Sequence, residues 1–529
     1  MRPPSHLAER IRASRATLEG ERKQVTVLFA DLKGSLEAIS DLDPEEAREV
    51  IDPILEKMMD AVHRYEGTVN QVLGDGIMAL FGAPLSHEDH AVRACYAALA
   101  MQAAILKLNE QTRLSHGVEL QIRVGINSGE VVVRALDSDL SLEYSAVGLT
   151  THLAARMEQL AAPGTIRMTP HTLSLAEGFV LATSLGPTRV KGLDEPIEVF
   201  ELTGVSTLRT RVQVAAPRGL TRFVGRNTEI EILAKTVERA SSGRGEIVAL
   251  VGEAGVGKSR LVWEFTRSHR LQSWSVLESA SVSYGKASAY KPLIDLLKNY
   301  FQVDDADNAR RIREKVTGKL LALDRGFEPL LPAFLSLLDV PFENPEWQSL
   351  VPALRRTRTL DACKRLIVRE SQLQPLVLVF EDLHWVDAET QAFLDSMVDS
   401  LATARILLLV NYRPEYSHDW TGKTFYAQLR IDPLTSESSH ELLDALLGRE
   451  AGLAGLRELL IERTQGNPFF IEECVRTLFE TGALKGERGN YRLAAPLSEA
   501  LVPQRVQSIL AARIDSRSHL QRHAAGAQA

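Results

Sequence analysis

A glycine-rich loop between an apolar strand and a helix constrains the fold of this chain more than any other feature. Residues 252–259 read Gly-Glu-Ala-Gly-Val-Gly-Lys-Ser, directly after the apolar run 247–251 and before a helical run that starts near Arg260. In such a loop the backbone N–H groups surround phosphate oxygens, the lysine reaches the terminal phosphates and the serine binds Mg²⁺. The sequence therefore predicts a parallel α/β sheet with a nucleoside triphosphate at its edge. The predicted ATP-binding residues are Gly252, Gly255, Gly257, Lys258 and Ser259.

A second apolar run ends in two acidic residues. Residues 376–380 read Leu-Val-Leu-Val-Phe and lead directly into Glu381 and Asp382. An acidic pair after a buried parallel strand is the expected edge at which such a fold handles metal and water. We predict catalytic roles for both acids and a metal-binding role for Asp382. The sequence alone does not decide which of the two is the main metal ligand and which is the catalytic base.

Two further aspartates interrupt apolar runs near the start of the chain. Asp31 lies in the run that begins at Val27, and Asp75 lies between Gly74 and Gly76. Aspartates at strand ends often serve only as turn formers. Two converging carboxylates also suit a pair of Mg²⁺ ions in line with a nucleotide phosphate, the arrangement used in phosphoryl chemistry.

Composition places the chain among large intracellular proteins. Its 529 residues are too many for one core and predict several domains, and the net charge of −8 argues against a generally basic nucleic-acid surface. No uninterrupted apolar run approaches membrane-spanning length, and residues 1–6 lack the apolar stretch of a secretory signal. The three cysteines, Cys95, Cys363 and Cys474, are far apart in sequence and predict buried, reduced thiols. We expect a cytoplasmic protein without a membrane partner.

Residues from about 20 to 204 resemble the class III nucleotide cyclase homology domain, the family of adenylate and guanylate cyclases. The resemblance implies a ferredoxin-like α+β domain and a homodimer, because in the family the active site forms between two such domains. Its motifs appear in the family's order as Phe29-Ala30-Asp31, Gly74-Asp75-Gly76, residues 88–94, Arg123-Val124-Gly125-Ile126-Asn127-Ser128-Gly129, Leu153-Ala154-Ala155-Arg156 and Val190-Lys191-Gly192-Leu193.

The resemblance implies roles for individual residues. Asp31, the adjoining Leu32 and Asp75 match the metal site for Mg²⁺ or Mn²⁺, and Arg156 matches the arginine that stabilises charge on the transferred phosphorus. Three other positions depart from the family pattern. His152 stands where the family has a ribose-orienting asparagine, while Gln71 and Ser145 replace the base-reading lysine and its partner. Glutamine offers a donor and an acceptor to a base edge, so the choice between ATP and GTP stays open.

The second half resembles the STAND ATPases, relatives of the AAA group. Residues 381–387 resemble the family's Walker B segment, and residues 223–226 its domain entry near adenine. Arg413, after the apolar run 406–410, resembles the γ-phosphate sensor, and Gly466-Asn467-Pro468 matches the Gly-x-Pro motif of the helical lid.

These observations together predict an α/β multidomain chain, in which a parallel-sheet P-loop NTPase with a helical lid follows the cyclase-like domain. Residues 501–515 resemble the entry to a winged-helix region, and we expect the closing residues 523–529 to be a truncated or frame-shifted, disordered end. The expected order is a lead-in at 1–20, the cyclase-like domain at 21–205, a linker at 206–220, the STAND/AAA-like domain at 221–432, the lid at 433–500 and the truncated start of a winged-helix region at 501–529.

The predicted function is a nucleotide cyclase coupled to an ATP-binding switch, which makes a cyclic nucleotide and pyrophosphate from ATP or GTP and has a possible slow ATPase. One alternative is a cyclase-like domain without catalysis, which serves as a dimerisation or nucleotide-sensing module. A third reading is an ATP-dependent transcription regulator, although the net charge and the short C-terminal region make DNA binding unexpected.

Overall fold

The computed structural model describes residues 21–33, 44–87, 89–112, 120–136, 143–191, 195–206, 210–282, 289–304 and 307–494. The expected lead-in at 1–20 and the expected winged-helix start at 501–529 lie outside these residues. The chain divides into two compact units, the second of which runs from Thr210 to Pro503.

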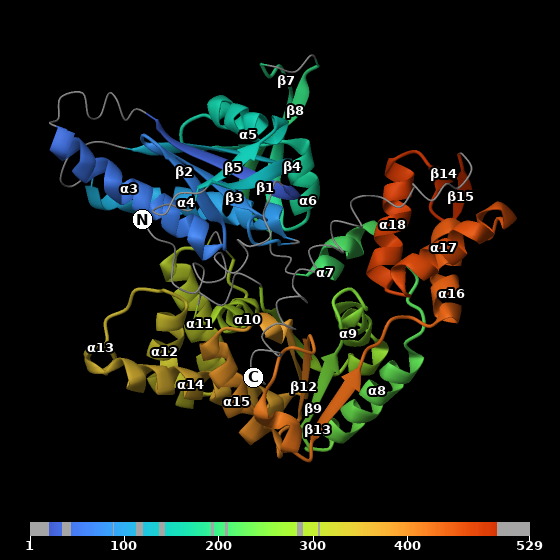
Figure 1. Ribbon diagram of the computed structural model, residues 1–529. Helices are drawn as coiled ribbons and strands as arrows, with labels where there is room; N and C mark the ends of the chain where they lie inside the picture. Colours follow the sequence, from blue (N-terminus) through green and yellow to red (C-terminus); the bar gives the residue numbers. More distant parts are fainter. Residues whose placement is uncertain are drawn as a thin grey trace, which may run out of the picture. The chain divides into compact units, whose positions relative to one another are not determined.

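The first unit is built on a mixed β-sheet with helices on both faces (Figure 1). Its strands are β1 (Glu21–Lys33), β2 (Thr68–Leu73), β3 (Gly76–Phe81), β4 (Gln121–Leu136), β5 (Glu143–Val147), β6 (Ile166–Met168), β7 (Val180–Thr188) and β8 (Ile197–Val205). Its helices are α3 (Pro44–Arg64), α4 (His90–Thr112), α5 (Leu149–Leu160) and α6 (Pro170–Ala176).

The strand order confirms the predicted ferredoxin-like fold. Elements β1, α3, β2, β3, α4 and β4 follow one another along the chain, and their strands lie in the spatial order β2-β3-β1-β4. The sheet continues through β6, β8 and β7, and β5 pairs with β4. Helix α5 can pack closely on β4 because Gly125 has no side chain. A Cβ at this position would lie only 2.0 Å from the backbone nitrogen of Glu158.

Helix α4 is the core helix on the other face of this sheet. Its segment His90–Asn109 is long and apolar enough to cross a membrane by length and composition, but 56% of that window is buried inside the unit. Thr26 on β1 contacts His90 at the start of this helix through a side-chain hydrogen bond of 2.7 Å. The apolar composition of α4 is thus accounted for by its packing against the sheet.

The second unit contains a five-stranded parallel sheet in the order β10-β11-β12-β9-β13. Its strands are β9 (Glu246–Val251), β10 (Ser275–Ala280), β11 (Leu376–Glu381), β12 (Ile406–Tyr412) and β13 (Tyr426–Arg430), and a separate hairpin is formed by β14 (Leu484–Glu487) and β15 (Asn490–Leu493). Its helices are α7 (Arg211–Ala215), α8 (Asn227–Ser241), α9 (Lys258–Thr266), α10 (Lys291–Phe301), α11 (Ala309–Leu323), α12 (Leu331–Leu337), α13 (Pro345–Ser349), α14 (Pro352–Leu373), α15 (Ala388–Leu401), α16 (Ser436–Leu447), α17 (Ala454–Thr464) and α18 (Pro468–Glu480).

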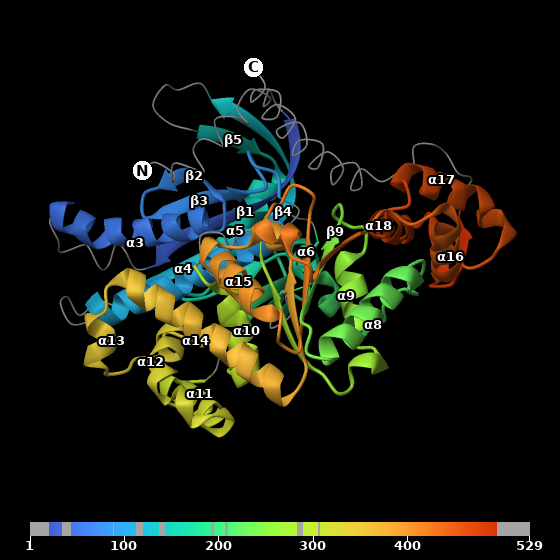
Figure 2. The ribbon, with the colours of Figure 1, turned by 90° about the horizontal axis from the view of Figure 1, so that it is seen from below.

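Helices cover both faces of this parallel sheet, as its uniformly apolar strands require. Every residue of β9, β11 and β12 is buried. Helices α8 and α9 lie together on one face, while α10, α14 and α15 lie on the other; Figure 2 shows α11, α12 and α14 grouped on that second side. Helices α16, α17 and α18 and the β14–β15 hairpin form the predicted helical lid.

Candidate functional site

Asp31 lies at the end of β1, directly across from Arg123 on β4. The two strands are antiparallel and pair these residues in register, and Arg123 Nη2 donates a 2.7 Å hydrogen bond to Asp31 Oδ2. The same nitrogen lies 2.7 Å from Glu158 Oε1 on α5. Arg123 and Glu158 had no predicted role, although a charged residue within the apolar strand 122–126 was a usable signal.

Asp75 occupies the tight turn between β2 and β3, next to Asp31. Gly74 in this turn has a φ of +66°, and a Cβ at Gly76 would lie 3.1 Å from Asp31 Oδ1. Burial raises the pKa of Glu158, the nearby charges of Asp31 and Asp75 raise it further, and Arg123 opposes them. The structure therefore brings the two predicted metal-binding aspartates and Glu158 into one neighbourhood.

These carboxylates fit a divalent cation that arrives with a nucleotide. Within the described ranges, no three His, Cys, Asp or Glu side chains form a ready-made metal cage. Mg²⁺ commonly binds through only one or two carboxylates together with substrate phosphates, so a complete protein cage is not required. Three carboxylates beside one guanidinium leave an excess of two negative charges, which matches one divalent ion.

Arg156 and His152 do not face the aspartates of their own chain. The Arg156 guanidinium donates to Gln159 on the same helix, whereas Glu158 lies against Arg123. Residues two apart on an α-helix point about 200° apart, so Arg156 and Glu158 project in opposite directions. His152 is exposed and, four residues before Arg156, lies on the same side of α5.

The other predicted residues of this site lie on three strands, β2, β5 and β1. Gln71 is exposed on β2, opposite Met78 of β3. Ser145 is on β5, where its backbone pairs with Arg134 of β4, and its side chain is outside the described residues. Leu32 is buried, and its side chain lies on the opposite face of β1 from that of Asp31.

The glycine-rich loop joins β9 to α9 as predicted. Gly255 and Gly257 have φ values of +80° and +99°, which a residue with a side chain rarely adopts. Lys258 Nζ donates to the carbonyl oxygens of Gly252 at 2.7 Å and Glu253 at 2.9 Å. Burial lowers the pKa of Lys258 to about 8, while Asp382 raises it and Arg413 lowers it further, so these predicted residues lie around the same ammonium group.

Glu381 is buried at the end of β11 and is held by polar partners. Asn411 Nδ2 on β12 donates to Glu381 Oε2 at 2.9 Å, and Ser259 of the loop also bonds this carboxyl group. Burial and the neighbouring Asp382 raise the pKa of Glu381 to about 8. Asp382 adopts a φ of +56°, and its N–H donates to Asn411 Oδ1 at 2.8 Å. Asn411 therefore contacts both acidic residues, and its sequence signal was a polar amide directly after the apolar run 406–410.

The raised pKa of Glu381 predicts a pH-dependent stability. Between the ordinary value of 4.5 and about 8 the folded state keeps a proton that the unfolded state has released, so stability falls as pH rises through this window. Glu381→Gln is expected to remove that fall, with an effect of up to a few kcal/mol near pH 8.

Thermal unfolding of the nucleotide-free chain between pH 5 and 8 measures this effect. The exposed Glu231→Gln on α8 is the matched control and is expected to follow the wild-type curve. Parallel curves for Glu381→Gln and the wild type would show that the Glu381 carboxyl group does not titrate in this range.

The lid contacts the glycine-rich loop through the residues that begin α18. Asn467 Nδ2 donates to the carbonyl oxygen of Ala254 at 3.0 Å, and the Phe469 N–H donates to that of Gly255 at 3.3 Å. A Cβ at Gly255 would lie 2.7 Å from Asn467 Oδ1, so only glycine leaves room for the lid at this point.

Arg226 holds the next carbonyl of the loop. Its guanidinium donates to Val256 at 3.0 Å and to the carbonyl oxygen of Asp432, which precedes the lid. Consecutive carbonyl groups at 254, 255 and 256 are therefore bound by residues outside the loop. The conformation of the loop and the position of the lid depend on each other.

We expect Asn467→Ala to release bound nucleotide about tenfold faster, because the lid loses its amide bond to Ala254. Stopped-flow displacement of a fluorescent ADP analogue measures this rate. The exposed Asn490→Ala in the β14–β15 hairpin is the control. An unchanged release rate would mean that the lid contact does not retain nucleotide.

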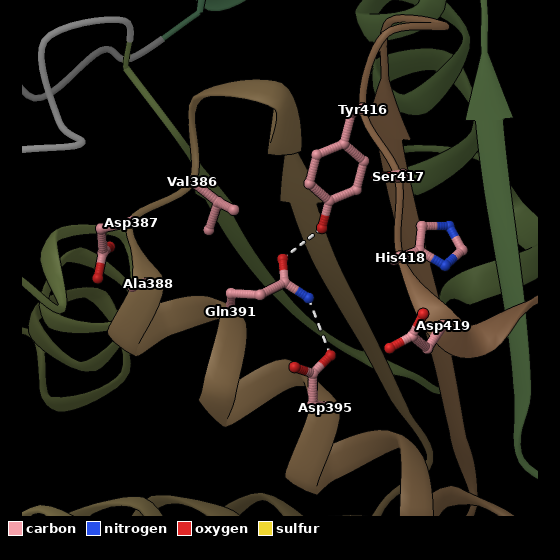
Figure 3. A pocket seen from close by; sticks show the side chains of 9 residues that line it. All are labelled: Val386, Asp387, Ala388, Gln391, Asp395, Tyr416, Ser417, His418 and Asp419. Carbon is pink, nitrogen blue, oxygen red and sulfur yellow. Dashed lines mark hydrogen bonds between the residues drawn. The ribbon is translucent and has the colours of Figure 1, made fainter. Parts of the chain in front are cut away.

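A pocket of about 620 Å³ lies between α15 and the segment that follows β12 (Figure 3). Inside it Gln391 donates to Asp395 at 2.9 Å and accepts a hydrogen bond from Tyr416. Asp387 caps α15 by accepting from the N–H of Thr390 at 3.0 Å. None of the predicted nucleotide-binding residues lines this pocket, so it is separate from the glycine-rich loop.

Comparison with protein families matches three segments. Residues 19–204 match the adenylate and guanylate cyclase catalytic domain, residues 222–410 an AAA ATPase domain and residues 435–492 a domain of unknown function. An uncharacterized protein of Rhizobium meliloti is 26% identical over 458 residues, which cover 86% of this chain and 44% of that protein. Adenylate cyclase 1 of the same organism is 29% identical over 192 residues, 35% of this chain and 28% of that protein. The chain thus spans less than half the length of these relatives.

Solved structures similar to the chain include two cyclases. The adenylyl cyclase CyaB from P. aeruginosa is 29% identical with a TM-score of 0.34, covering 37% of this chain and 98% of that one. The guanylyl cyclase Cya2 is 34% identical with a TM-score of 0.33, covering 35% of this chain and 95% of that one. By the two family matches, the chain combines a segment that matches the adenylate and guanylate cyclase catalytic domain with a segment that matches an AAA ATPase domain.

Proposed function

We propose that the chain is a nucleotide cyclase whose output is coupled to an ATP-binding switch of the STAND type. The observation that carries the catalytic half is the convergence of Asp31 and Asp75 beside the Arg123–Glu158 pair. The match of residues 19–204 to a cyclase catalytic domain and the likeness to adenylate cyclase 1 support the same reaction.

In the proposed reaction the ribose 3′-hydroxyl of ATP attacks the α-phosphorus. The bond from O3′ to the α-phosphorus forms, the bond to the bridging oxygen of the β-phosphate breaks, and pyrophosphate leaves as the hydroxyl proton is released. Mg²⁺ or Mn²⁺ would be held by the carboxylates of Asp31 and Asp75 together with the backbone carbonyl of Leu32, and would supply charge neutralisation.

A homodimer completes this site in our proposal. Arg156 and His152 project away from the aspartates of their own chain, so a second copy must bring its Arg156 to the substrate. A guanidinium fits the charge that develops on the transferred phosphorus. Gln71 and Ser145 would contact the base, and the choice between ATP and GTP is left to measurement.

The second unit is proposed to bind ATP through Lys258 and Ser259, with Glu381 and Asp382 as the acidic pair and Arg413 as the sensor. The lid contacts at residues 254 and 255, with the Arg226 bond at residue 256, support a switch, because a nucleotide that reshapes the loop also changes what holds the lid. Buried free cysteines and the use of nucleoside triphosphates favour a cytoplasmic location.

A cyclic-nucleotide assay on the purified full chain tests the proposal. Product from ATP or GTP with Mn²⁺ or Mg²⁺, absent in Asp31→Ala, is the expected result. Product no higher than that of Asp31→Ala would remove the enzyme and leave the competing function, a dimerisation or nucleotide-sensing module. The departures at His152 and Gln71 favour that competitor.

A further inference from the structure

The guanidinium of Arg123 holds the carboxylate that the proposed metal needs. Arg123 Nη2 donates to Asp31 Oδ2 at 2.7 Å, so one lone pair of this carboxylate is already in use. A divalent cation at Asp31 would meet this positive charge at close range. Cation and guanidinium therefore compete for one carboxylate.

Glu158 offers the guanidinium a second acceptor. Its Oε1 lies 2.7 Å from the same Arg123 nitrogen but accepts no hydrogen bond, and Arg123 Nε is also buried without a hydrogen-bond partner. A guanidinium carries five N–H donors in a rigid fork, so a small rotation about its own bonds can direct two of them at Glu158.

The position of Glu158 is fixed by the backbone. Gly125 lies two residues after Arg123 on the same face of β4, where a Cβ would lie 2.0 Å from the Glu158 nitrogen and 2.4 Å from the carbonyl oxygen of Ala154. Strand and helix are thus in direct backbone contact. The second acceptor is held at a constant place whether or not Asp31 is free.

We infer that Arg123 is a positioning residue. When a divalent cation binds at the proposed cyclase site, its guanidinium exchanges its hydrogen bond to Asp31 for hydrogen bonds to Glu158. In this exchange the Arg123–Asp31 hydrogen bond breaks and bonds from Arg123 to Glu158 form. The partly buried guanidinium is never left without a carboxylate, and Asp31 gains the lone pair that the cation requires. This inference rests on the proposed function, because it assumes that Asp31 binds the metal.

Mn²⁺ alone, without nucleotide, is the probe, and its binding to the full chain is measured by electron paramagnetic resonance. The component lost in Asp31→Ala defines the site. We expect Glu158→Gln to weaken this component about tenfold, since Arg123 then stays on Asp31, and Arg123→Gln to tighten it about tenfold. In the Arg123→Gln background, Glu158→Gln should have little further effect.

Control variants separate this exchange from loss of folding. Arg167 and Glu201 form an ion pair between β6 and β8 of the same unit, and Arg167→Gln or Glu201→Gln should leave Mn²⁺ affinity unchanged. Thermal unfolding of each variant shows whether it folds. Arg123→Lys keeps a charge beside Asp31 and is expected to bind Mn²⁺ as the wild type does, so it is the charge-conserving control. If Arg123→Gln unfolds, Arg123→Met, which also removes the charge, replaces it as the test.

Several results would overturn the inference. Weaker or unchanged Mn²⁺ binding in Arg123→Gln would make Arg123 a support rather than a competitor. Equal weakening by Glu158→Gln in both backgrounds would make Glu158 a metal ligand. If Asp31→Ala removes no Mn²⁺ component, the proposed metal site itself fails, which is a different outcome from failure of the exchange.

Discussion

Asp31→Ala is expected to lower cyclic nucleotide formation at least about a thousandfold, because the phosphates lose the charge-neutralising site that Asp31 forms with Asp75. Arg156→Ala should cost about a hundredfold or more, since a guanidinium no longer meets the charge on the transferred phosphorus. Both rates are measured as product formed from ATP and from GTP. Circular dichroism and thermal unfolding are the controls that check whether the two variants remain folded.

Mixing the two inactive variants tests whether the site is shared. In a heterodimer of Asp31→Ala with Arg156→Ala, one of the two sites combines an intact Asp31 with an intact Arg156. An equal mixture is therefore expected to regain about a quarter of wild-type activity. An activity equal to the sum of the two separate variants would contradict a site built from two copies.

Lys258→Ala is expected to weaken ATP binding to the second unit about a hundredfold. The lysine ammonium is predicted to exchange its bonds with the Gly252 and Glu253 carbonyls for charge-assisted bonds to phosphate oxygens, which the variant cannot form. The affinity is measured by titrating a fluorescent ATP analogue. The titration is made in the Asp31→Ala background, which weakens nucleotide binding at the cyclase site. Lys235→Ala, at an exposed position on α8, is the matched control.

The same variant tests the coupling between the two units. If ATP at the second unit sets the cyclase rate, Lys258→Ala changes that rate at saturating substrate while Lys235→Ala does not. An unchanged cyclase rate in a chain that has lost ATP binding at Lys258 would refute the coupling. The cyclase reaction itself would stand.

Local patterns predicted much of the architecture. Ile54, Met58 and Ala61 recur at helical spacing along the sequence, and all three are buried in α3. The apolar runs that became β9, β11 and β12 read as parallel strands because both of their faces are covered. The three cysteines are buried and free, as their wide spacing predicted. The segment 206–220, predicted as a linker, contains the short helix α7, which Thr210 and Gln213 cap.

The candidate sites were predictable only where their residues are neighbours in sequence. Lys258 and Ser259 lie in one loop and Asp75 lies in one hairpin, so motif and spacing were sufficient to propose roles for them. Arg123, Glu158 and Asn467 lie in segments that match family motifs, but those motifs gave them no individual role, and Asn411 had no predicted role either. Their partners are defined by strand register, by close helix packing and by the docking of the lid.

The amino-acid sequence by itself determined the order of the two domains, the strands and helices of their cores and the loop that carries Lys258, because these depend on local periodicity and on glycine conformations. Tertiary structure decided that Arg123 pairs with Asp31, 92 residues away, and that Asn467 binds Ala254, 213 residues away. Such contacts depend on which strands pair and in which register, and neither is encoded within a single segment. The charge of the cyclase-like site and the closure over the glycine-rich loop are therefore properties of the folded chain.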